Sequence, residues 1–398
     1  MTEITLSAVV PTRNRPENLL RLLRSLAIQT TPLLEVIISD AGDVPIDEQS
    51  LRAEFPPLNV RVLRAEPSVC AQRNRAIRNS SGSHIFLCDD DMDVPPEYLH
   101  DIVRYFRAHP SAGAVSGRVV EAGEDGQFPD SLPTIGPEKL FWNWVFQKSV
   151  WADVNGMRST TLMKPLASFL RTRYARRGNT ITRAGFPLVT QWTPVMRTAF
   201  YGLGAAVIRR EWLAGSPFDE RLDEHGIGDN YGVAMGFPGQ ERIIVLRDNP
   251  VYHHRSEVNR LAAAESWRRR ILALDYFTAQ NRRSVFSRRL FLLWSLAASM
   301  VEFAVGGLLQ TSVGPRLNSR ALPPENQESA AGDPFTVSRE KLILQNAGPG
   351  SQSADSGTAS ALSMFRTAWK TFWLIARNRN PYIQRMRAES TDLNPPRA

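Results

Sequence analysis

The sequence has little cysteine and lacks the short motifs that mark several common enzyme classes. Its two cysteines, Cys70 and Cys88, have neither disulfide-framework nor zinc-site spacing, and both lie among apolar or small residues. They are expected to be buried free thiols, which suits a reducing cytoplasm. No glycine-rich phosphate loop and no serine–histidine–aspartate arrangement for nucleophilic catalysis is present. The opening residues, MTEITLSAVVPTRNRP, lack a basic segment followed by an apolar one, so a secretory signal is not expected.

The composition is that of a chain able to build a sizeable core, with an excess of basic residues. It has 398 residues, of which 42% are hydrophobic and 22% charged, and a formal net charge of +8. Such a charge suits nucleic acid, anionic lipid or phosphorylated substrates. Eleven basic and four acidic residues fall between Arg255 and Arg320. Because they accompany apolar helical segments rather than a base-stacking surface, nucleic acid is not an expected partner.

The stretch HIFLCDDDMDVPP carries the strongest sign of chemistry. An apolar run, Ile85 to Cys88, leads directly into Asp89, Asp90 and Asp91. Adjacent carboxylates repel one another and prefer water to a protein interior. A divalent cation such as Mg²⁺ or Mn²⁺ would compensate them, and such an ion usually brings phosphate oxygens with it. The alternative is a solvated acidic turn in which Asp93 caps the next helix.

The first part of the chain alternates between predicted strands and predicted helices. Strands are expected at residues 4–10, 34–39, 59–63, 85–88 and 113–120, and Pro11 is expected to end the first of them. Helices are expected from Pro16 and over residues 69–79. This alternation predicts an α/β fold with a mostly parallel sheet and right-handed crossovers. Ligands gather at the carboxyl ends of such strands, where the sequence places Arg13, Arg15, Asp40 and the three aspartates.

Three segments between residues 4 and 100 follow one another in a familiar order: VVPTRNRPENLLRLLRSLAIQT, EVIISDAGD and CAQRNRAIRNSSGSHIFLCDDDMDVPPEYL. Together they resemble the family 2 glycosyltransferases, inverting enzymes with the GT-A fold and a metal-binding DxD motif. The resemblance implies a Rossmann-like sheet flanked by helices, a nucleoside diphosphate sugar as donor, and Mg²⁺ or Mn²⁺ as cofactor. It also implies a donor and nucleotide pocket lined by Pro11, Thr12, Arg15, Asp40, Arg73, Asp89 and Asp90, with Asp89 and Asp91 as metal ligands.

The segment FDERLDEHGIGDNYGVAMGF, residues 218–237, resembles the part of these enzymes that introduces the catalytic base. Where an acidic pair is common in the family, this chain has Asp229 followed by Asn230. Asp229 is therefore the expected base, with Asp223 and Glu224 in reserve. A turn in which Asp229 only caps a helix is the alternative.

Three further features bear on the site. By the same resemblance His253 is a candidate third metal ligand, and alternation along a strand allows only one of His253 and His254 to face the site. Gly202 and Gly204 suit a loop lying close against a ligand. The aromatic stretch at 141–151, FWNWVFQKSVW, is expected either to pack in the core or to form a platform for an acceptor.

The remaining chain is expected to be helical, with one flexible part. The expected division is a catalytic domain at 1–255 (nucleotide half 1–112, acceptor half 113–255), a basic and apolar helical region at 256–310, a low-complexity linker at 311–361, and an amphipathic helix with a tail at 362–398.

Two of these helical segments suggest a membrane. Leu290 to Leu309 is about long enough to cross a bilayer, but it contains Glu302, so a helix packed on the protein or lying at a membrane surface is expected instead. Met364 to Arg379 is expected to interact with anionic lipid or to dock on the protein. Its expected apolar face comprises Met364, Phe365, Ala368, Trp369, Phe372 and Ile375, and its basic face Arg366, Lys370 and Arg377.

The sequence thus predicts a metal-dependent inverting glycosyltransferase that acts on a hydroxyl acceptor. A lipid-linked or surface-polysaccharide glycan is the expected acceptor, and the expected location is the cytoplasm or the cytoplasmic face of the inner membrane. A nucleotidyltransferase and a non-catalytic module that binds a nucleotide sugar are the alternatives.

Overall fold

The computed structural model describes residues 3–123, 127–215, 217–239, 242–254, 258–259, 261–280, 285–312 and 361–393. The predicted linker at 311–361 lies outside these residues, apart from its ends.

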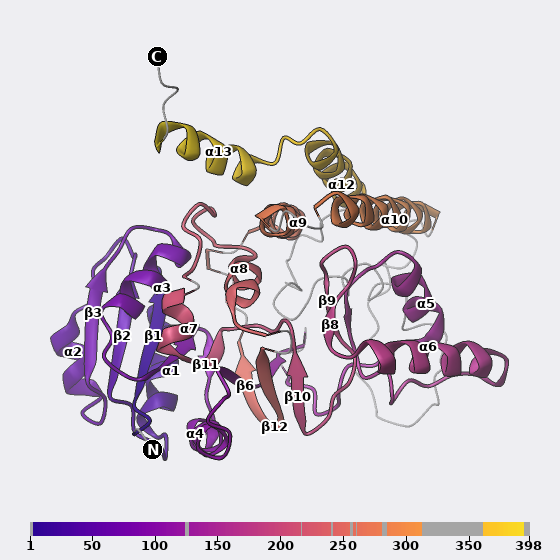
Figure 1. Cartoon of the computed structure of the whole chain (residues 1–398). Helices are drawn as coiled ribbons and strands as arrows, with labels where there is room; N and C mark the ends of the chain where they lie inside the picture. The colour runs from indigo at the N-terminus through magenta and orange to yellow at the C-terminus, as the bar shows by residue number, and fades with distance from the viewer. Residues whose placement is uncertain are drawn as a thin grey trace, which may run out of the picture.

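A nine-stranded sheet occupies the centre of the molecule (Figure 1), in the order β10-β12-β6-β11-β4-β1-β2-β3, with β5 paired to β12. The strands that run in one direction are β1 (Leu6–Thr12), β2 (Glu35–Asp40), β3 (Val60–Arg64), β4 (His84–Cys88), β6 (Ala114–Glu121) and β12 (Ile243–His253). Those that run antiparallel to their neighbours are β5 (Met92–Asp93), β10 (Val195–Thr198) and β11 (Ala205–Arg209). The predicted mostly parallel sheet is confirmed.

Helices cover both faces of this sheet. Because successive strand residues point to opposite faces, Val9 packs in one core while Ala8 and Val10 pack in the other. The core around Ala8 includes side chains of α1 (Pro16–Ala27), α2 (Glu48–Glu54) and α4 (Tyr98–Ala108). The core around Val9 includes side chains of α3 (Val69–Arg78), α7 (Arg210–Gly215), α8 (Asp229–Gly236) and α9 (Ala263–Gln280).

A smaller unit lies beside the main sheet, at the right of Figure 1. It has a three-stranded sheet in the order β7-β9-β8 and a core of its own. Its elements are α5 (Pro137–Val145), β7 (Val150–Trp151), the 3₁₀ helix Thr161–Met163, α6 (Lys164–Arg177), β8 (Thr180–Ile181) and β9 (Pro187–Val189).

The C-terminal helices form a layer along one side of the molecule, at the top of Figure 1. They are α9, α10 (Val285–Ser312), α12 (Ala361–Ala376) and α13 (Pro381–Leu393). Helix α9 packs on α8, and α12 packs on both α9 and α10. The two cysteines, Cys70 and Cys88, are buried free thiols as expected.

The sequence misjudged two local details. Strand β1 continues through Pro11 to Thr12, because the carbonyl of Thr12 still accepts a hydrogen bond from the N–H of Ala41 at 3.0 Å. Helix α12 does not separate its aromatic and basic side chains as predicted. Trp369 is exposed beside the basic residues, because the buried side of the helix is formed by smaller residues around Ala368.

Candidate active site

A cavity of about 380 Å³ lies at the carboxyl ends of β1 and β4, facing α8 and α9. Nine of the ten residues predicted to form the site line this cavity: Pro11, Thr12, Arg15, Arg73, Asp89, Asp90, Asp91, Asp229 and His253. One space therefore receives side chains from the ends of β1 and β4, from helices α3 and α8, and from the last residue of β12. Parallel α/β topology favours such a site, because ligands gather where the parallel strands end.

Asp90, the middle residue of the aspartate run, is held by the last residue of β1 and by Arg15 in the turn after it. Its carboxylate accepts hydrogen bonds from the hydroxyl of Thr12 at 2.7 Å and from Nη1 of Arg15 at 3.1 Å. Burial, and then the charge of Asp91, raise the pKa of Asp90 to about 6 despite these partners. The guanidinium of Arg15 also donates to the carbonyl of Val258, which fixes its position.

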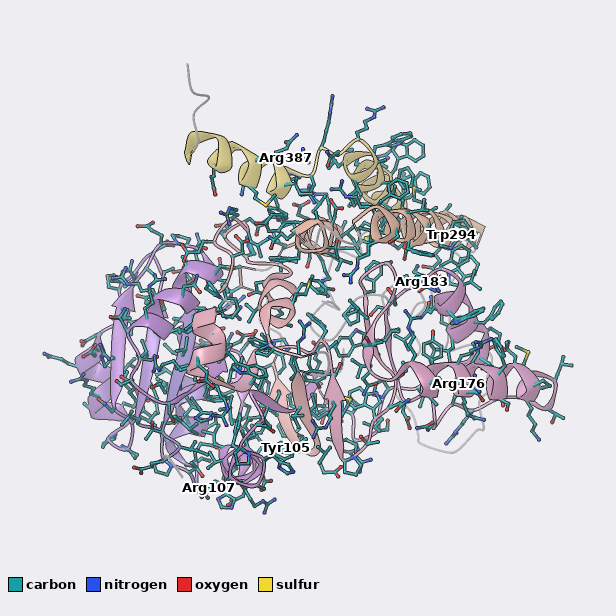
Figure 2. The ribbon with its side chains drawn as sticks, viewed as in Figure 1. Tyr105, Arg107, Arg176, Arg183, Trp294 and Arg387 are labelled. Atoms are coloured by element: carbon teal, nitrogen blue, oxygen red, sulfur yellow. The ribbon has the colours of Figure 1, made fainter. Side chains whose placement is uncertain are left out.

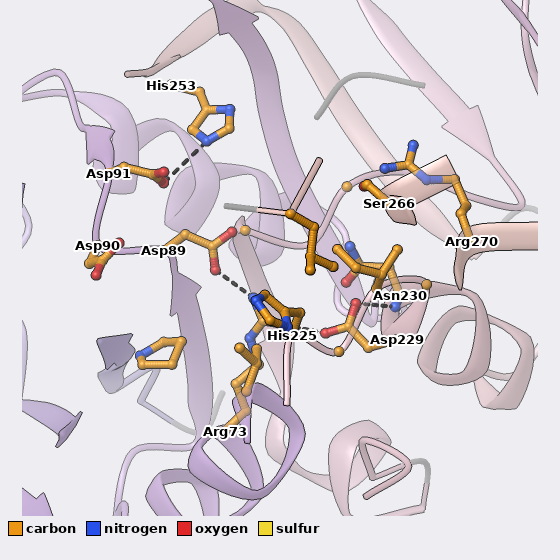
Figure 3. A pocket seen from close by; sticks show the side chains of 18 of the residues that line it. Arg73, Asp89, Asp90, Asp91, His225, Asp229, Asn230, His253, Ser266 and Arg270 are labelled. Atoms are coloured by element: carbon orange, nitrogen blue, oxygen red, sulfur yellow. Dashed lines mark hydrogen bonds and ion pairs between the residues drawn. The ribbon is translucent and has the colours of Figure 1, made fainter. Parts of the chain in front are cut away.

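Asp91 turns toward the end of β12 (Figure 3), where its Oδ1 lies 3.1 Å from Nε2 of His253. On the other side of the imidazole, Nδ1 lies 3.6 Å from Glu121, the last residue of β6. Burial favours the neutral imidazole, but Asp91 and Glu121 outweigh it and raise the pKa of His253 to about 10. His254 does not line the cavity, so the histidines divide as strand alternation predicts.

Arg73 connects the two acidic parts of the cavity (Figure 3). From α3 its guanidinium bonds Asp89 on one side at 2.5 Å and Asp229 on the other. It is buried, and its carbon Cζ lies 5.0 Å from the centre of the Phe218 ring. The two carboxylates raise the pKa of Arg73 above its usual value although burial opposes this, so the side chain is a fixed positive charge.

Asp229 is the first residue of α8 and follows a glycine-bounded turn. Gly226 and Gly228 both have positive φ angles, +58° and +93°, which favour glycine. The Asp229 carboxylate accepts the N–H of Asn230 at 2.6 Å. Burial raises the pKa of Asp229 to about 6, although Arg73 holds it down. Asp229 therefore does not merely cap a helix, because its other oxygen binds Arg73 inside the cavity.

Asp40 is the tenth predicted residue, and it does not line the cavity. It ends β2 and is almost fully buried. Its carboxylate binds Nη1 of Arg64 at 2.5 Å and accepts the N–H groups of Gly42 and Ile46. These contacts order the loop that follows β2.

The two reserve candidates for the base are engaged in other contacts. Asp223 pairs with Arg269 at 2.8 Å and accepts the hydroxyl of Tyr382 at 2.6 Å, and it does not line the cavity. Glu224 does line it, but pairs with Arg13 at 2.9 Å and is about half exposed.

The cavity also contains groups that the sequence did not single out. Glu121 could have been found, because it directly follows the predicted strand at 113–120 and strand ends were expected to carry the site. Arg270 comes from α9 and had no such signal. Within the described part of the chain it forms no ion pair, whereas Arg13, Arg15 and Arg73 each have a carboxylate partner.

An aromatic wall completes the cavity. Trp151, Phe200, Tyr201 and Tyr231 line it, and the rings of Phe200 and Tyr231 stack with centroids 4.5 Å apart. Of the aromatic stretch at 141–151, only Trp151 reaches the cavity.

The donor set around the aspartate run is suited to a hard divalent cation, but it is not fully assembled. Among the described residues no group of three or more histidine, cysteine and acidic side chains lies close enough to hold a metal. Asp91 and His253 already meet, while Asp89, the third predicted ligand, binds Arg73. Its side chain is 35% exposed, so it can turn within the cavity. Two carboxylates and an imidazole are ligands that Mn²⁺ accepts.

Residues 7–159 match the family model described as Glycosyl transferase family 2. The match identifies residues 7–159 as a family 2 glycosyltransferase domain, and the mostly parallel sheet flanked by helices agrees with the GT-A fold that the sequence resemblance implied. The chain is 33% identical over 100 residues to the uncharacterized glycosyltransferase YwdF of Bacillus subtilis (strain 168), a match that spans 25% of this chain and 37% of that relative.

Similar solved structures include residues 1–349 of TarS from S. aureus, with 16% identity, a TM-score of 0.46, and coverage of 79% of this chain and 76% of that one. The mannosyltransferase PcManGT from Pyrobaculum calidifontis, in complex with GDP-Man and Mn²⁺, has 18% identity, a TM-score of 0.43, and coverage of 78% and 80%.

Proposed function

We propose that this protein transfers a sugar from a nucleoside diphosphate sugar to a hydroxyl acceptor, with inversion at the anomeric carbon. The observation that carries the proposal is the arrangement of acids in one cavity. A run of three aspartates follows β4, and a single buried aspartate, Asp229, begins α8 on the facing side. Arg73 bonds both Asp89 and Asp229 and thereby links the two acidic groups across the cavity.

Asp229 is the proposed general base. A base that works near neutral pH should have a pKa close to the working pH, so that it is charged but still accepts a proton. The pKa of about 6 that burial gives Asp229 meets this requirement. Its carboxylate would accept the proton of the acceptor hydroxyl as the oxygen attacks the anomeric carbon. A single displacement of this kind inverts the configuration.

Asp89, Asp91 and His253 are the proposed ligands for Mg²⁺ or Mn²⁺. When bound, such an ion would stabilise the negative charge that develops on the departing diphosphate. Asp90 is the proposed contact to the donor, and Thr12 and Arg15 orient it. Pro11 belongs to the same donor wall.

Arg270 is a proposed ligand of the donor phosphates. Figure 3 shows its guanidinium beside Ser266 on α9, at the side of the cavity where Asn230 lies. The other three arginines of the cavity are bonded to carboxylates, so Arg270 is the one whose charge is available to an anionic substrate within the described residues. This role explains why a helix that follows the catalytic sheet contributes to its cavity.

The proposed acceptor is a glycan, either lipid-linked or part of a surface polysaccharide. The aromatic wall around Trp151 and Phe200 supports this choice, because aromatic faces pack against the apolar faces of sugar rings. A cytoplasmic place of action stays a prediction.

The release of nucleoside diphosphate from a panel of donor sugars, measured with and without Mn²⁺ or Mg²⁺, tests the proposal. We expect metal-dependent release for one donor, increased by a hydroxyl acceptor. Asp229→Asn should still bind the donor but lose transfer by about 100-fold or more. A nucleotidyltransferase would instead form the nucleotide sugar and release pyrophosphate, and a non-catalytic module would bind the donor without turnover.

A further inference from the structure

The outer side of α10 is an exposed apolar surface. Phe286 is 86% exposed and Leu290 is 58% exposed, and further exposed apolar side chains follow along the helix: Trp294, Val301 and Val305. Their spacing of four or seven residues puts them on one side of the helix. Phe146 of the smaller unit stacks on Trp294, with ring centroids 4.9 Å apart, and extends this surface toward α5. Figure 2 shows Trp294 at the edge of the molecule where α10 and α5 meet.

The outer side of α12 combines tryptophan with basic side chains. Trp369 and Trp373 are 49% and 37% exposed, and their ring centroids are 5.7 Å apart. Arg366 and Lys370 are exposed on the same side. Arg377, the first residue after the helix, is also exposed, and its guanidinium lies 5.0 Å from the Trp373 ring centre. The helix contains no acidic residue. This outer side is therefore both aromatic and positively charged.

The opposite side of α10 is fixed to the catalytic part of the protein. Glu302 accepts hydrogen bonds from Nζ of Lys139 at 3.3 Å and from Nζ of Lys148, and Lys148 also donates to Ser299 at 3.1 Å. At the edge of the outer side, Trp294 Nε1 donates to the carbonyl of Val145 at 3.2 Å and also holds α10 on the smaller unit. Within the described residues one helical stretch, Phe286–Gly306, is long and apolar enough to cross a bilayer, and 33% of it is buried. Crossing would break these contacts and leave Glu302 in lipid.

We propose that the outer sides of α10 and α12 form a docking surface for a bilayer that contains anionic lipids, with both helices lying along the membrane plane. The α10–α12 surface comprises Phe286, Leu290, Trp294, Val301, Val305, Arg366, Trp369, Lys370, Trp373 and Arg377. Tryptophan suits the boundary between lipid headgroups and acyl chains, and exposed cations bind acidic headgroups. The long stems of arginine and lysine let an apolar side enter the boundary while the charges stay in water.

This charge pattern is the reason to choose a bilayer over a second copy of the chain. Two identical copies meeting through α12 would bring Arg366, Lys370 and Arg377 against one another, without an acidic residue on α12 to pair with them. The proposal does not depend on sugar transfer, because none of the residues of the α10–α12 surface lines the cavity.

Cosedimentation of the full-length protein with vesicles tests this surface. We expect binding to vesicles of phosphatidylcholine with phosphatidylglycerol, little binding to phosphatidylcholine alone, and release by high salt. Arg366→Gln/Lys370→Gln/Arg377→Gln should weaken binding about 100-fold, from the loss of three surface cations. The matched control Arg78→Gln/Arg104→Gln/Arg107→Gln removes the same charge elsewhere and should change binding less than threefold. Figure 2 shows Arg107 at the opposite edge of the molecule.

A second pair of variants tests the apolar contribution. Phe286→Ser/Leu290→Ser should reduce vesicle binding about tenfold or more, whereas Ile28→Ser/Val44→Ser, at equally exposed positions away from α10, should not. Vesicle binding that does not depend on lipid charge or on salt concentration would overturn the proposal. An equal loss of vesicle binding in the test variants and in the control variants would also overturn it. The protein could instead fail to bind vesicles and sediment as a dimer that the same α10 and α12 variants convert to a monomer. That result would assign the surface to a second copy of the chain and overturn the proposal.

Discussion

Replacing Arg73 by methionine tests whether Asp229 is the base, because Arg73 is the cation that holds the Asp229 carboxylate. Burial raises the pKa of Asp229 to about 6, and Arg73 is the largest opposing influence. A cation next to an aspartate lowers its pKa by about 1–3 units. In Arg73→Met the pKa of Asp229 should therefore rise to about 7–9, and the acidic limb of the kcat profile should move up by the same amount.

The size of this effect at neutral pH follows directly. For a shift of two units, the charged fraction of Asp229 at pH 7 falls about tenfold, and kcat at that pH falls with it. At pH 9 most of the loss should be recovered. Arg73→Lys is the matched control, because it keeps a positive charge between the carboxylates and should move the limb by less than one unit.

The assay is the pH dependence of nucleoside diphosphate release at saturating donor, acceptor and Mn²⁺, with circular dichroism to confirm folding. Saturating donor removes any contribution of Arg73 to donor affinity from the profile. If Arg73→Met lowers kcat equally at every pH, Asp229 does not supply the ionisation that limits the reaction at acid pH. The assignment of Asp229 as the base would then be wrong.

Three further substitutions have definite expected outcomes. Asp91→Asn should abolish Mn²⁺-dependent turnover and weaken Mn²⁺ binding in calorimetry without lowering the melting temperature; unchanged Mn²⁺ affinity would remove Asp91 from the metal site. Gly204→Ala should lower kcat about tenfold or more, because its new Cβ would lie 2.3 Å from the first carboxylate of the aspartate run, while Gly202→Ala, with nothing within 4 Å, should be nearly neutral. Glu302→Gln should lower the free energy of unfolding by about 3 kcal/mol, because it leaves the buried Lys148 ammonium without its counter-ion. Denaturant unfolding measures this loss, and Lys148→Met/Glu302→Leu should recover most of it; an unchanged stability in Glu302→Gln would show that the pair is not buried in solution.

The nucleotide half of the fold was predictable because its signals are local. Apolar runs ending in polar groups identified β1, β2 and β4, and the rule that ligands gather at strand ends placed Arg15 and the aspartate run together. The same rule also placed Asp40 at the site, but Asp40 is not among the residues that line the cavity. A carboxylate at a strand end faces the cavity only if nothing closer binds it, and Arg64 of the neighbouring strand does.

Features that depend on distant packing were not predictable. Arg270 enters the cavity because α9 packs on α8, and the spacing of residues within α9 gives no sign of that contact. One residue of α12, Trp369, was assigned to the wrong face for a related reason, whereas Met364, Ala368 and Ile375 are buried as predicted. Trp369 is the larger apolar side chain, but Ala368 is the one that lets α12 approach its neighbours closely. The order of apolar and charged residues predicts that a helix is amphipathic. Which of its residues are buried depends on the helices that pack against it.

Helix α9 links the cavity to the outer helical layer, and this link would limit which acceptors the proposed transferase could reach. Arg270 on α9 lines the cavity, while the carbonyl of Leu272 accepts a hydrogen bond from Asn380 at 2.7 Å, in the segment between α12 and α13. Gly228 lies so near Ala273 that a Cβ there would come within 2.6 Å of it. Such close packing leaves little freedom for the cavity to tilt relative to α12. A membrane bound by α12 would therefore hold the cavity mouth at a set height and angle above the bilayer. Among chemically similar acceptors, only those whose hydroxyl lies at that distance from the bilayer would reach the cavity.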